Sequence, residues 1–397
     1  MNKTGHEDGH CPHSAAHTNS VPGVLILVLC SLVAGGAMAS TIDTLPARHW
    51  LELPNTNLSQ VYPDPWPGGT TGPQSVMKTW CGGAFDTKRD RLIIWCGGHN
   101  DYWGNEIYVF DVNQATWIRL TEPSSPTTQD YPHNPDGRPI ARHTYDLLEY
   151  LPTVDAFVSF GGGSPGGVPN PSIDWFEFSR NEWTQKQDHP EFGGVIGRVS
   201  AWDPVTGHAW VHGTYSPSKL AEYDPLNDTW VVHGSSRYLE IDGNAAIDPE
   251  RRLMVLVGGY NPDVRQIYVW DLNNPDAPAT SPSTTGDNTL EYARAVGFDY
   301  DPVIKKFVGW NGGGQVYTLD PDTWSWERID PAPDNTVLPT APEPNGTYSR
   351  FRYMPSKNAY ILANRTTDNV FIYRLTDFVT LSPPQTPAAP TVTLSAP

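Results

Sequence analysis

The sequence predicts an all-β fold, a β-propeller in which six blades can be counted. Three observations predict it. A short hairpin turn recurs six times along the chain, and the strand after most of these turns ends in glycines. The composition is rich in Trp (15), Tyr (18), Gly (35) and Pro (39), whereas charged residues make up only 18%. Such a composition is typical of many short strands joined by tight turns.

The six turns form an internal repeat. Each joins two apolar stretches, and one marker residue stands at the same place in each turn: Asp86, Leu151, Asp203, Asp248, Asp301 and Met354. Successive markers lie about 45 to 65 residues apart, which is the spacing of a four-stranded propeller blade. The first step is the longest and indicates a long loop in the first unit.

The other strands of each unit carry their own signals. Glycines close most second strands, at Gly97-Gly98, Gly161–Gly163, Gly213, Gly258-Gly259 and Gly312–Gly314. We expect neighbouring backbones to converge there, since glycine leaves no side chain in the way. Fourth strands open at a tryptophan in four units, at Trp117, Trp183, Trp230 and Trp324, and we expect these rings to pack between blades.

The double glycine, the Tyr-x-x-Asp third strand and the later Trp together resemble the Kelch motif over residues 74–378. The sixth unit, which contains Val370–Tyr373, lacks a fourth strand, whereas His49–Leu53 is a strand without a unit. We therefore predict that the N-terminal strand completes the last blade, because this closes the ring and removes an open sheet edge. A degenerate seventh blade is left open.

The ends of the chain differ in composition from the repeats. Val24–Ala34 is a short apolar run followed by Ala37-Met38-Ala39, which predicts a signal peptide over residues 1–39 and export, to the periplasm or the extracellular medium. The run is short for a bilayer span, so a retained anchor is the alternative and no stable membrane anchor is expected. The propeller is assigned to 40–381. Residues 382–397 form a Pro/Thr-rich linker or the start of a truncated C-terminal module.

Two cysteines remain after cleavage, Cys81 and Cys96. They are equidistant from the turn centred between Lys88 and Arg89, so they face each other across one antiparallel hairpin. Facing cysteines in an exported chain predict a disulfide. A zinc site that uses both thiolates is the alternative.

The net charge is −18, and no Lys/Arg-rich run is present. Nucleic acid is therefore not expected as a partner, because its phosphates require a basic surface. We expect a monomer that needs no metal or other cofactor.

Topology places two histidines on one face of the propeller. Loops that join second to third strands emerge on the same face as the segments that lead into first strands. His99 follows Gly97-Gly98 at the first kind of position, and Arg142-His143-Thr144-Tyr145 occupies the second kind. His99 stands in a loop dense with polar and aromatic residues, including Tyr102 and Asn105, which favours function over packing.

Arginines recur before the first strands. Arg142, Arg198 and Arg294 all lie an odd number of residues before their turn markers, so strand alternation predicts that they share one side. Arg350 and Arg352 have even offsets and are left out of this set. A ring of inward arginines would bind a carboxylate or sulfate, because the guanidinium group presents a planar fork of donors. The alternative is that these arginines pair with Asp and Glu between blades.

The stretch Gly97–Asp111, together with Arg142-His143-Thr144-Tyr145, resembles propeller-type polysaccharide lyases that act on ulvan and on rhamnose-capped glucuronic acid. The resemblance implies β-elimination on an acidic polysaccharide or oligosaccharide. It implies that His99, His143 and Tyr145 are catalytic and that Arg198 grips the uronate. We add Arg294, Arg142, Asn105 and Tyr102 as candidate substrate-binding residues.

Three other functions are known for propellers of this kind, and one of them is the main alternative. A copper oxidase of the galactose oxidase type needs a cysteine free to crosslink to a tyrosine, and both mature cysteines are assigned to one hairpin. Sialidase boxes of the form Ser-x-Asp-x-Gly-x-Thr-Trp are absent. The main alternative is a non-catalytic propeller that binds a glycan or a protein, since fold does not dictate function.

Overall fold

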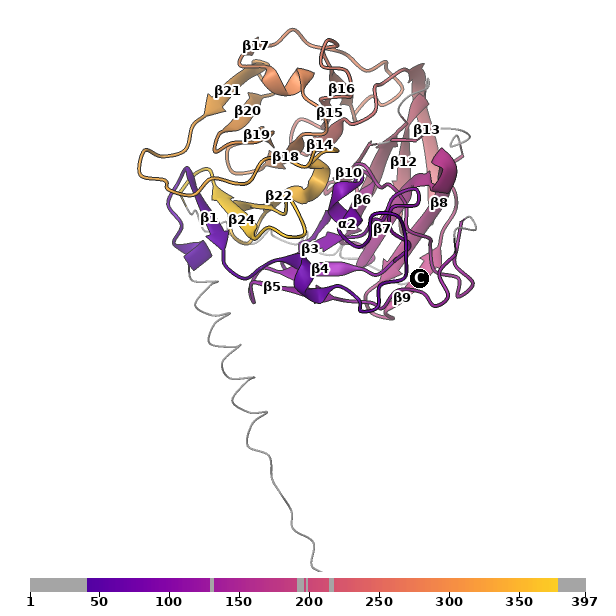
Figure 1. The fold of residues 1–397 in the computed structure, drawn as a ribbon. Helices are drawn as coiled ribbons and strands as arrows, with labels where there is room; N and C mark the ends of the chain where they lie inside the picture. Colours follow the sequence, from indigo (N-terminus) through magenta and orange to yellow (C-terminus); the bar gives the residue numbers. More distant parts are fainter. Residues whose placement is uncertain (1–40, 129–131, 191–195, 198, 214–217, 378–397) are drawn as a thin grey trace, which may run out of the picture.

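Six small antiparallel sheets form a ring around a central channel, so the chain is a six-bladed β-propeller (Figure 1). The computed structural model describes residues 41–377 apart from 129–131, 191–195, 198 and 214–217. The predicted signal peptide (1–39), the tail (382–397) and Arg198 lie outside the described residues. Within the described part of the chain there is no seventh sheet.

The first three blades have four strands each. Blade one consists of β2 (Ala84–Asp86), β3 (Arg91–Ile94), β4 (Tyr108–Asp111) and β5 (Thr116–Arg119). Blade two consists of β6 (Leu148–Leu151), β7 (Ala156–Ser164), β8 (Val168–Glu177) and β9 (Glu182–Gln185). Blade three consists of β10 (Val199–Asp203), β11 (His208–His212), β12 (Ser218–Asp224) and β13 (Thr229–Arg237).

The other three blades are less regular. Blade four has β14 (Asn244–Asp248), β15 (Leu253–Val257) and β16 (Ile267–Asp271), with an isolated bridge from Val269 to Thr280 beyond β16. Blade five has β18 (Gly297–Asp301), β19 (Lys306–Trp310), β20 (Val316–Asp320) and β21 (Ser325–Ile329), and the short β17 (Thr285–Gly286) pairs in parallel with β21. Blade six has β22 (Phe351–Met354), β23 (Ala359–Leu362), β24 (Val370–Arg374) and β1 (His49–Leu53).

Helical segments are short and lie in the connections. They are η1 (Leu58–Val61), α2 (Ser75–Lys78), η2 (Pro165–Gly167), η3 (Thr289–Tyr292) and η4 (Tyr348–Arg350). No helix in the described residues is long and apolar enough to cross a membrane.

The predicted closure of the ring by the N-terminal strand is confirmed. β1 is the outer strand of blade six and pairs with β24 in antiparallel register, from His49 opposite Arg374 to Leu53 opposite Val370. Figure 1 shows the two ends of the propeller, indigo and yellow, in this one blade. The indole N–H of Trp50 also donates to the carbonyl of Gly314 at 2.8 Å, which ties the closing strand to blade five.

The predicted disulfide is confirmed as well. In the β2–β3 hairpin Ala84 lies opposite Ile93, which is the register that places Cys81 opposite Cys96. The two cysteines form a disulfide with their Cα atoms 5.8 Å apart. A zinc site built from two free thiolates is therefore excluded.

Apolar side chains form clusters between neighbouring blades, as the tryptophans predict. The cluster between blades one and two contains Trp95 and Trp183, whose ring centroids are 5.2 Å apart. Equivalent clusters fill the other five interfaces. The core is thus divided among six interfaces, because a blade buries both faces of its sheet against its neighbours.

The glycines that end second strands stand where backbones meet. A Cβ atom on Gly162 would lie 2.2 Å from the carbonyl oxygen of His143, and one on Gly258 would lie 2.6 Å from that of Ala293. The first contact lies within blade two, and the second joins blade four to the segment that leads into blade five. The expected convergence of backbones is confirmed at these positions.

Candidate functional site

One backbone feature shapes the channel mouth, by which we mean the end of the channel where first strands begin. Six residues before each turn marker, the chain adopts a positive φ angle between 48° and 69°. The six residues are Trp80, Tyr145, Gly197, Asp242, Ala295 and Tyr348. Positive φ is uncommon for residues other than glycine, so its repetition in all six blades is a property of the fold. Here the chain turns from the loop into the strand that lines the channel.

Hydrogen bonds link these residues around the mouth. The N–H of Tyr145 donates to the carbonyl of Trp80 at 2.8 Å, and the N–H of Ala295 donates to that of Asp242 at 2.7 Å. The N–H of Tyr348 donates in turn to the carbonyl of Ala295 at 3.2 Å. Each of these three bonds joins adjacent blades, so backbone contacts between blades hold the side chains at the mouth.

An aromatic cluster fills part of the mouth. Tyr145 and Tyr348 pack with Ala295, and Trp80 lies against this cluster. The rings of Tyr145 and Tyr348 are perpendicular, with centroids 6.2 Å apart. Residues from blades one, two, five and six therefore meet here.

His99 and His143 lie side by side at this mouth. Their imidazole rings are stacked with centroids 3.8 Å apart, and Trp80 covers His143 with a centroid distance of 4.9 Å. The backbone N–H of His99 donates to Nε2 of His143 at 3.2 Å. The glycines nearby make this approach sterically feasible, since a Cβ on Gly98 would lie 2.7 Å from His143 Nε2 and one on Gly163 would lie 2.7 Å from His99 Nε2.

Asp101 adds a carboxylate beside the histidines. Its Oδ2 is 3.6 Å from Nε2 of His143, and the hydroxyl of Thr71 donates to its Oδ1 at 3.2 Å. The backbone N–H groups of Thr71 and Gly72 donate to the Asp101 carbonyl, so the segment before α2 holds the loop in place. The His143 side chain lowers the pKa of Asp101, which is therefore ionised at neutral pH.

Burial keeps both imidazoles neutral. Desolvation, with a contribution from His143, lowers the pKa of His99 to about 4. Desolvation also lowers the pKa of His143, although Asp101 opposes the shift. His99 Nε2 and His143 Nδ1 are buried and have no hydrogen-bond partner among the described residues. Unpaired buried polar atoms are costly, so they mark a place where a ligand group or water would be favourable.

A cation lies on the other side of the mouth. Arg294 Nε donates to Oδ2 of Asp242 at 2.5 Å, and the hydroxyl of Tyr348 donates to Oδ1 of the same carboxylate at 2.6 Å. The guanidinium carbon lies 4.6 Å from the ring centroid of Tyr260 and 5.8 Å from that of Trp80. The Arg294 side chain is 31% exposed, so its outer face is open to a ligand.

Tyr145 lies beside His143 and within the electrostatic influence of Arg294. Its ring centroid is 6.0 Å from that of His143, and the residue is 4% exposed. Burial, followed by the charge of Asp242, raises the pKa of its hydroxyl above the ordinary value of 10.0. The phenol is therefore protonated at neutral pH.

Three of the other predicted site residues are buried and paired within the protein. Arg142 is fully buried and pairs with Asp174 at 2.7 Å. Both belong to blade two, so this ion pair is structural but does not join two blades, as the alternative had expected. The Asn105 amide is buried and donates to Ser124 Oγ and to a backbone carbonyl. The hydroxyl of Tyr102 donates to buried Glu106 at 2.5 Å. These three side chains hold the loops behind the site, and Arg198 lies outside the described residues.

Four residues at the mouth were missed in the sequence, namely Trp80, Asp101, Asp242 and Tyr348. Trp80, Asp242 and Tyr348 occupy the positive-φ position. Their common distance of six residues before the turn marker was the signal in the sequence that could have identified them. The same feature explains why Arg142 and Arg294 do not share an environment. Both precede the positive-φ residue, which interrupts the strand alternation on which the prediction relied.

The fold and these residues define a six-bladed β-propeller with a histidine pair, a protonated tyrosine and an arginine at its channel mouth. No protein-family model and no curated protein matches this sequence. In the described part of the chain, no group of three or more His, Cys, Asp or Glu side chains is arranged to hold a metal ion.

Proposed function

We propose that this protein is an exported polysaccharide lyase that cleaves an acidic glycan by β-elimination at the channel mouth. The observation that carries the proposal is the convergence of His99, His143, Tyr145 and Arg294, which come from three blades. The resemblance of the His99 and His143 segments to propeller-type lyases supports the same reaction. The Cys81–Cys96 disulfide supports export, because disulfides persist in oxidising compartments.

Each residue has a task that its environment supports. Arg294 binds the uronate carboxylate through its exposed face and thereby stabilises the carbanion that forms at C5. Neutral His99 removes the C5 proton, and the electron pair forms the C4–C5 double bond as the C4–O bond breaks. Tyr145, which is protonated, donates its proton to the leaving oxygen. Arg198 keeps its predicted role as a second carboxylate clamp.

The low pKa of His99 is compatible with this role. The value of about 4 arises from burial and from the neighbouring imidazole. A substrate carboxylate in the mouth adds a negative charge close to both rings, and an opposite charge favours the protonated form. Substrate binding therefore raises the basicity of His99 when the base is needed.

A non-catalytic glycan-binding function is the second candidate. It is favoured by the low exposure of two of the three catalytic candidates, since His143 is 2% and Tyr145 is 4% exposed. A binding site can use Arg294, Trp80 and His99 at its surface without access to these buried groups.

Activity measurements distinguish the two functions. Purified protein is incubated with a panel of uronate polysaccharides, and the ultraviolet absorbance of the unsaturated product is followed. The lyase proposal expects turnover that is lost in His99→Ala and in Tyr145→Phe but retained in His208→Ala, a histidine on β11 that pairs with Glu222. Substrate binding without turnover in the unmodified protein supports the binding function instead.

A further inference from the structure

The opposite end of the channel contains a pocket, which we call the lower pocket. It has about 240 Å³ of free space and is lined by the hairpin turns of the six blades. In five blades a proline directly follows the turn marker, at Pro152, Pro204, Pro249, Pro302 and Pro355. In blade one Thr87 takes this place. The first strands run from the mouth to these turns, so the lower pocket is separate from the candidate lyase site.

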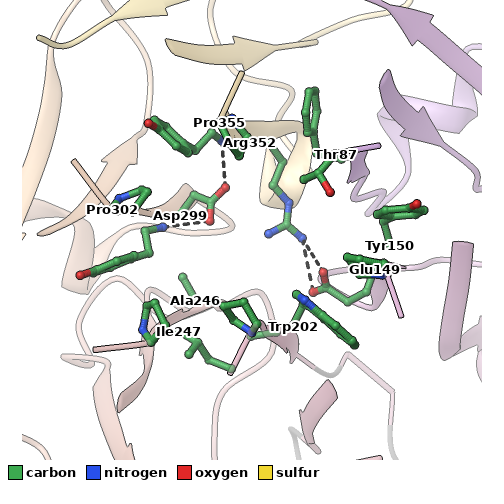
Figure 2. Close-up of a pocket in the computed structure, with 17 residues that line it drawn as sticks. Thr87, Glu149, Tyr150, Trp202, Ala246, Ile247, Asp299, Pro302, Arg352 and Pro355 are labelled. Carbon is green, nitrogen blue, oxygen red and sulfur yellow. Dashed lines mark hydrogen bonds and ion pairs between the residues drawn. The ribbon is translucent and has the colours of Figure 1, made fainter. Parts of the chain in front are cut away.

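The floor of the lower pocket is charged. The residues two positions before the turn markers point into the channel, and those that line the pocket are Glu149, Ala201, Ala246, Asp299 and Arg352. Figure 2 shows the Arg352 guanidinium projecting into the middle of the pocket, with Glu149 on one side and Asp299 on another. The pocket therefore offers both donors and acceptors to one small ligand.

The donors of Arg352 are poorly used within the protein. Its side chain is 10% exposed, yet its Nη2 makes only long contacts, at 3.3 and 3.4 Å to Glu149 and 3.5 Å to the carbonyl of Leu148. Its Nε is buried and has no hydrogen-bond partner in the part of the chain that is described. Buried guanidinium groups are normally paired and hydrogen-bonded. An arginine held in this state in the middle of a cavity points to a ligand that accepts hydrogen bonds.

The carboxylates limit the charge of that ligand. Asp299 accepts the backbone N–H groups of Tyr300 and Tyr353, both at 2.9 Å, and Glu149 accepts the Ser200 hydroxyl at 3.1 Å. These groups repel an anion, whereas Arg352 repels a cation. A ligand with neutral hydroxyl groups can accept from Arg352 and donate to both carboxylates without a charge conflict.

The walls are formed mainly by the prolines of the turns and by Ala201 and Ala246. Trp202, Tyr300 and Tyr353 directly follow inward-pointing residues on the first strands, so their rings turn toward the blade interfaces and not into the channel. Ligand pockets combine apolar walls with a few polar groups that fix orientation. The volume is below the roughly 300–1,000 Å³ of pockets for drug-sized ligands, so it is suited to a single ring.

We infer that the lower pocket binds one neutral sugar ring, with Arg352, Glu149 and Asp299 on its hydroxyls. This site is distinct from the proposed lyase site. It anchors a neutral sugar unit of a glycan on the face of the propeller opposite the mouth.

Three sugars that share one ring test the inference: glucose, glucosamine and glucuronate. Binding is measured by saturation-transfer NMR and calorimetry on the full protein. We expect glucose to bind, and both charged analogues to bind at least tenfold more weakly. Ala246→Leu places bulk in the cavity without removing a polar group and should weaken glucose binding at least tenfold. Ala201→Leu, at the equivalent place in blade three, should weaken it as well and serves if Ala246→Leu is unstable.

His99→Ala is the matched control, because it alters the mouth and leaves the lower pocket intact. Glucose binding that is retained in His99→Ala and lost in the two pocket variants supports the inference. No glucose binding, tighter binding of either charged analogue, or binding that is lost in His99→Ala but kept in Ala246→Leu overturns it. Loss of uronate cleavage in His99→Ala bears only on the lyase proposal, so the two proposals fail separately.

Discussion

The imidazole rings of His99 and His143 lie 3.8 Å apart although 44 residues separate them in the chain. His99 follows the second strand of blade one, and His143 precedes the first strand of blade two. The stack is therefore a contact between neighbouring blades, made possible by glycines on both sides. It places two neutral nitrogen bases next to a protonated phenol, which are the base and the acid of the β-elimination proposed above.

Stability should depend on the protonation of this pair. The pKa of His99 is about 4 in the folded protein and about 6.5 when the chain is unfolded. Between these values the unfolded state binds more protons, so stability is lost as pH falls from about 6.5 to about 4. His99→Gln should weaken this dependence, as measured by urea unfolding across the range. Because the pKa of His143 is lowered too, the variant should keep part of the dependence of stability on pH. If stability depended on pH to the same extent in His99→Gln as in the unmodified protein, the prediction would be contradicted.

Arg294 should contribute to transition-state binding. Removing one preorganised donor to a developing anion typically costs about 10²- to 10³-fold in rate. We expect Arg294→Ala to lower kcat/KM for uronate cleavage by this amount. Arg328→Ala is the control, because Arg328 pairs at the surface with Asp330 and its side chain is 48% exposed. Equal effects of the two substitutions would rule out a role for Arg294 at the site.

The buried pair of Arg142 and Asp174 should be structural. Removing one partner leaves an uncompensated buried charge, which typically costs about 3–5 kcal/mol. Asp174→Ala should therefore lower the free energy of unfolding by about this amount. Glu182→Ala, which breaks the exposed pair with Arg180, should change it by about 0–1 kcal/mol. Denaturant unfolding of both variants checks the difference.

Reduction of the Cys81–Cys96 disulfide should destabilise the propeller. The disulfide closes a loop of 15 residues, for which the loss of chain entropy in the unfolded state predicts about 3 kcal/mol. We expect a Cys81→Ser/Cys96→Ser double variant to unfold at lower denaturant concentration by this amount. Mass spectrometry of non-reduced peptides in which both cysteines carry free thiols would contradict the assignment itself.

The closing strand should be essential for stability. Trp50 is 2% exposed and packs between blades five and six. Its replacement by Ala should cost about 3–5 kcal/mol, as is usual for a buried aromatic ring. Leu226→Ala is the control, because Leu226 is 70% exposed. Thermal unfolding of the two variants measures the difference, and similar midpoints would show that β1 does not hold the ring closed.

The sequence by itself determined the blade count, the ring closure by His49–Leu53 and the pairing of Cys81 with Cys96. These features depend on hairpin turns, on strand alternation and on a repeat that recurs in every blade. Such signals are local or periodic, so they can be read without knowing how distant segments meet. The position of His99 and His143 on one face followed from the same topology.

Only the tertiary structure decided which side chains reach the mouth and the lower pocket. The positive-φ residues reverse the chain before each first strand, so strand alternation could not predict that Arg142 turns to Asp174 while Arg294 faces the mouth. Asp242 and Tyr348 meet at 2.6 Å although 106 residues separate them. The lower pocket is built in the same way, from two or three residues of each of the six blades. A channel assembles contacts between residues that are remote in sequence, because its lining exists only once the ring has closed.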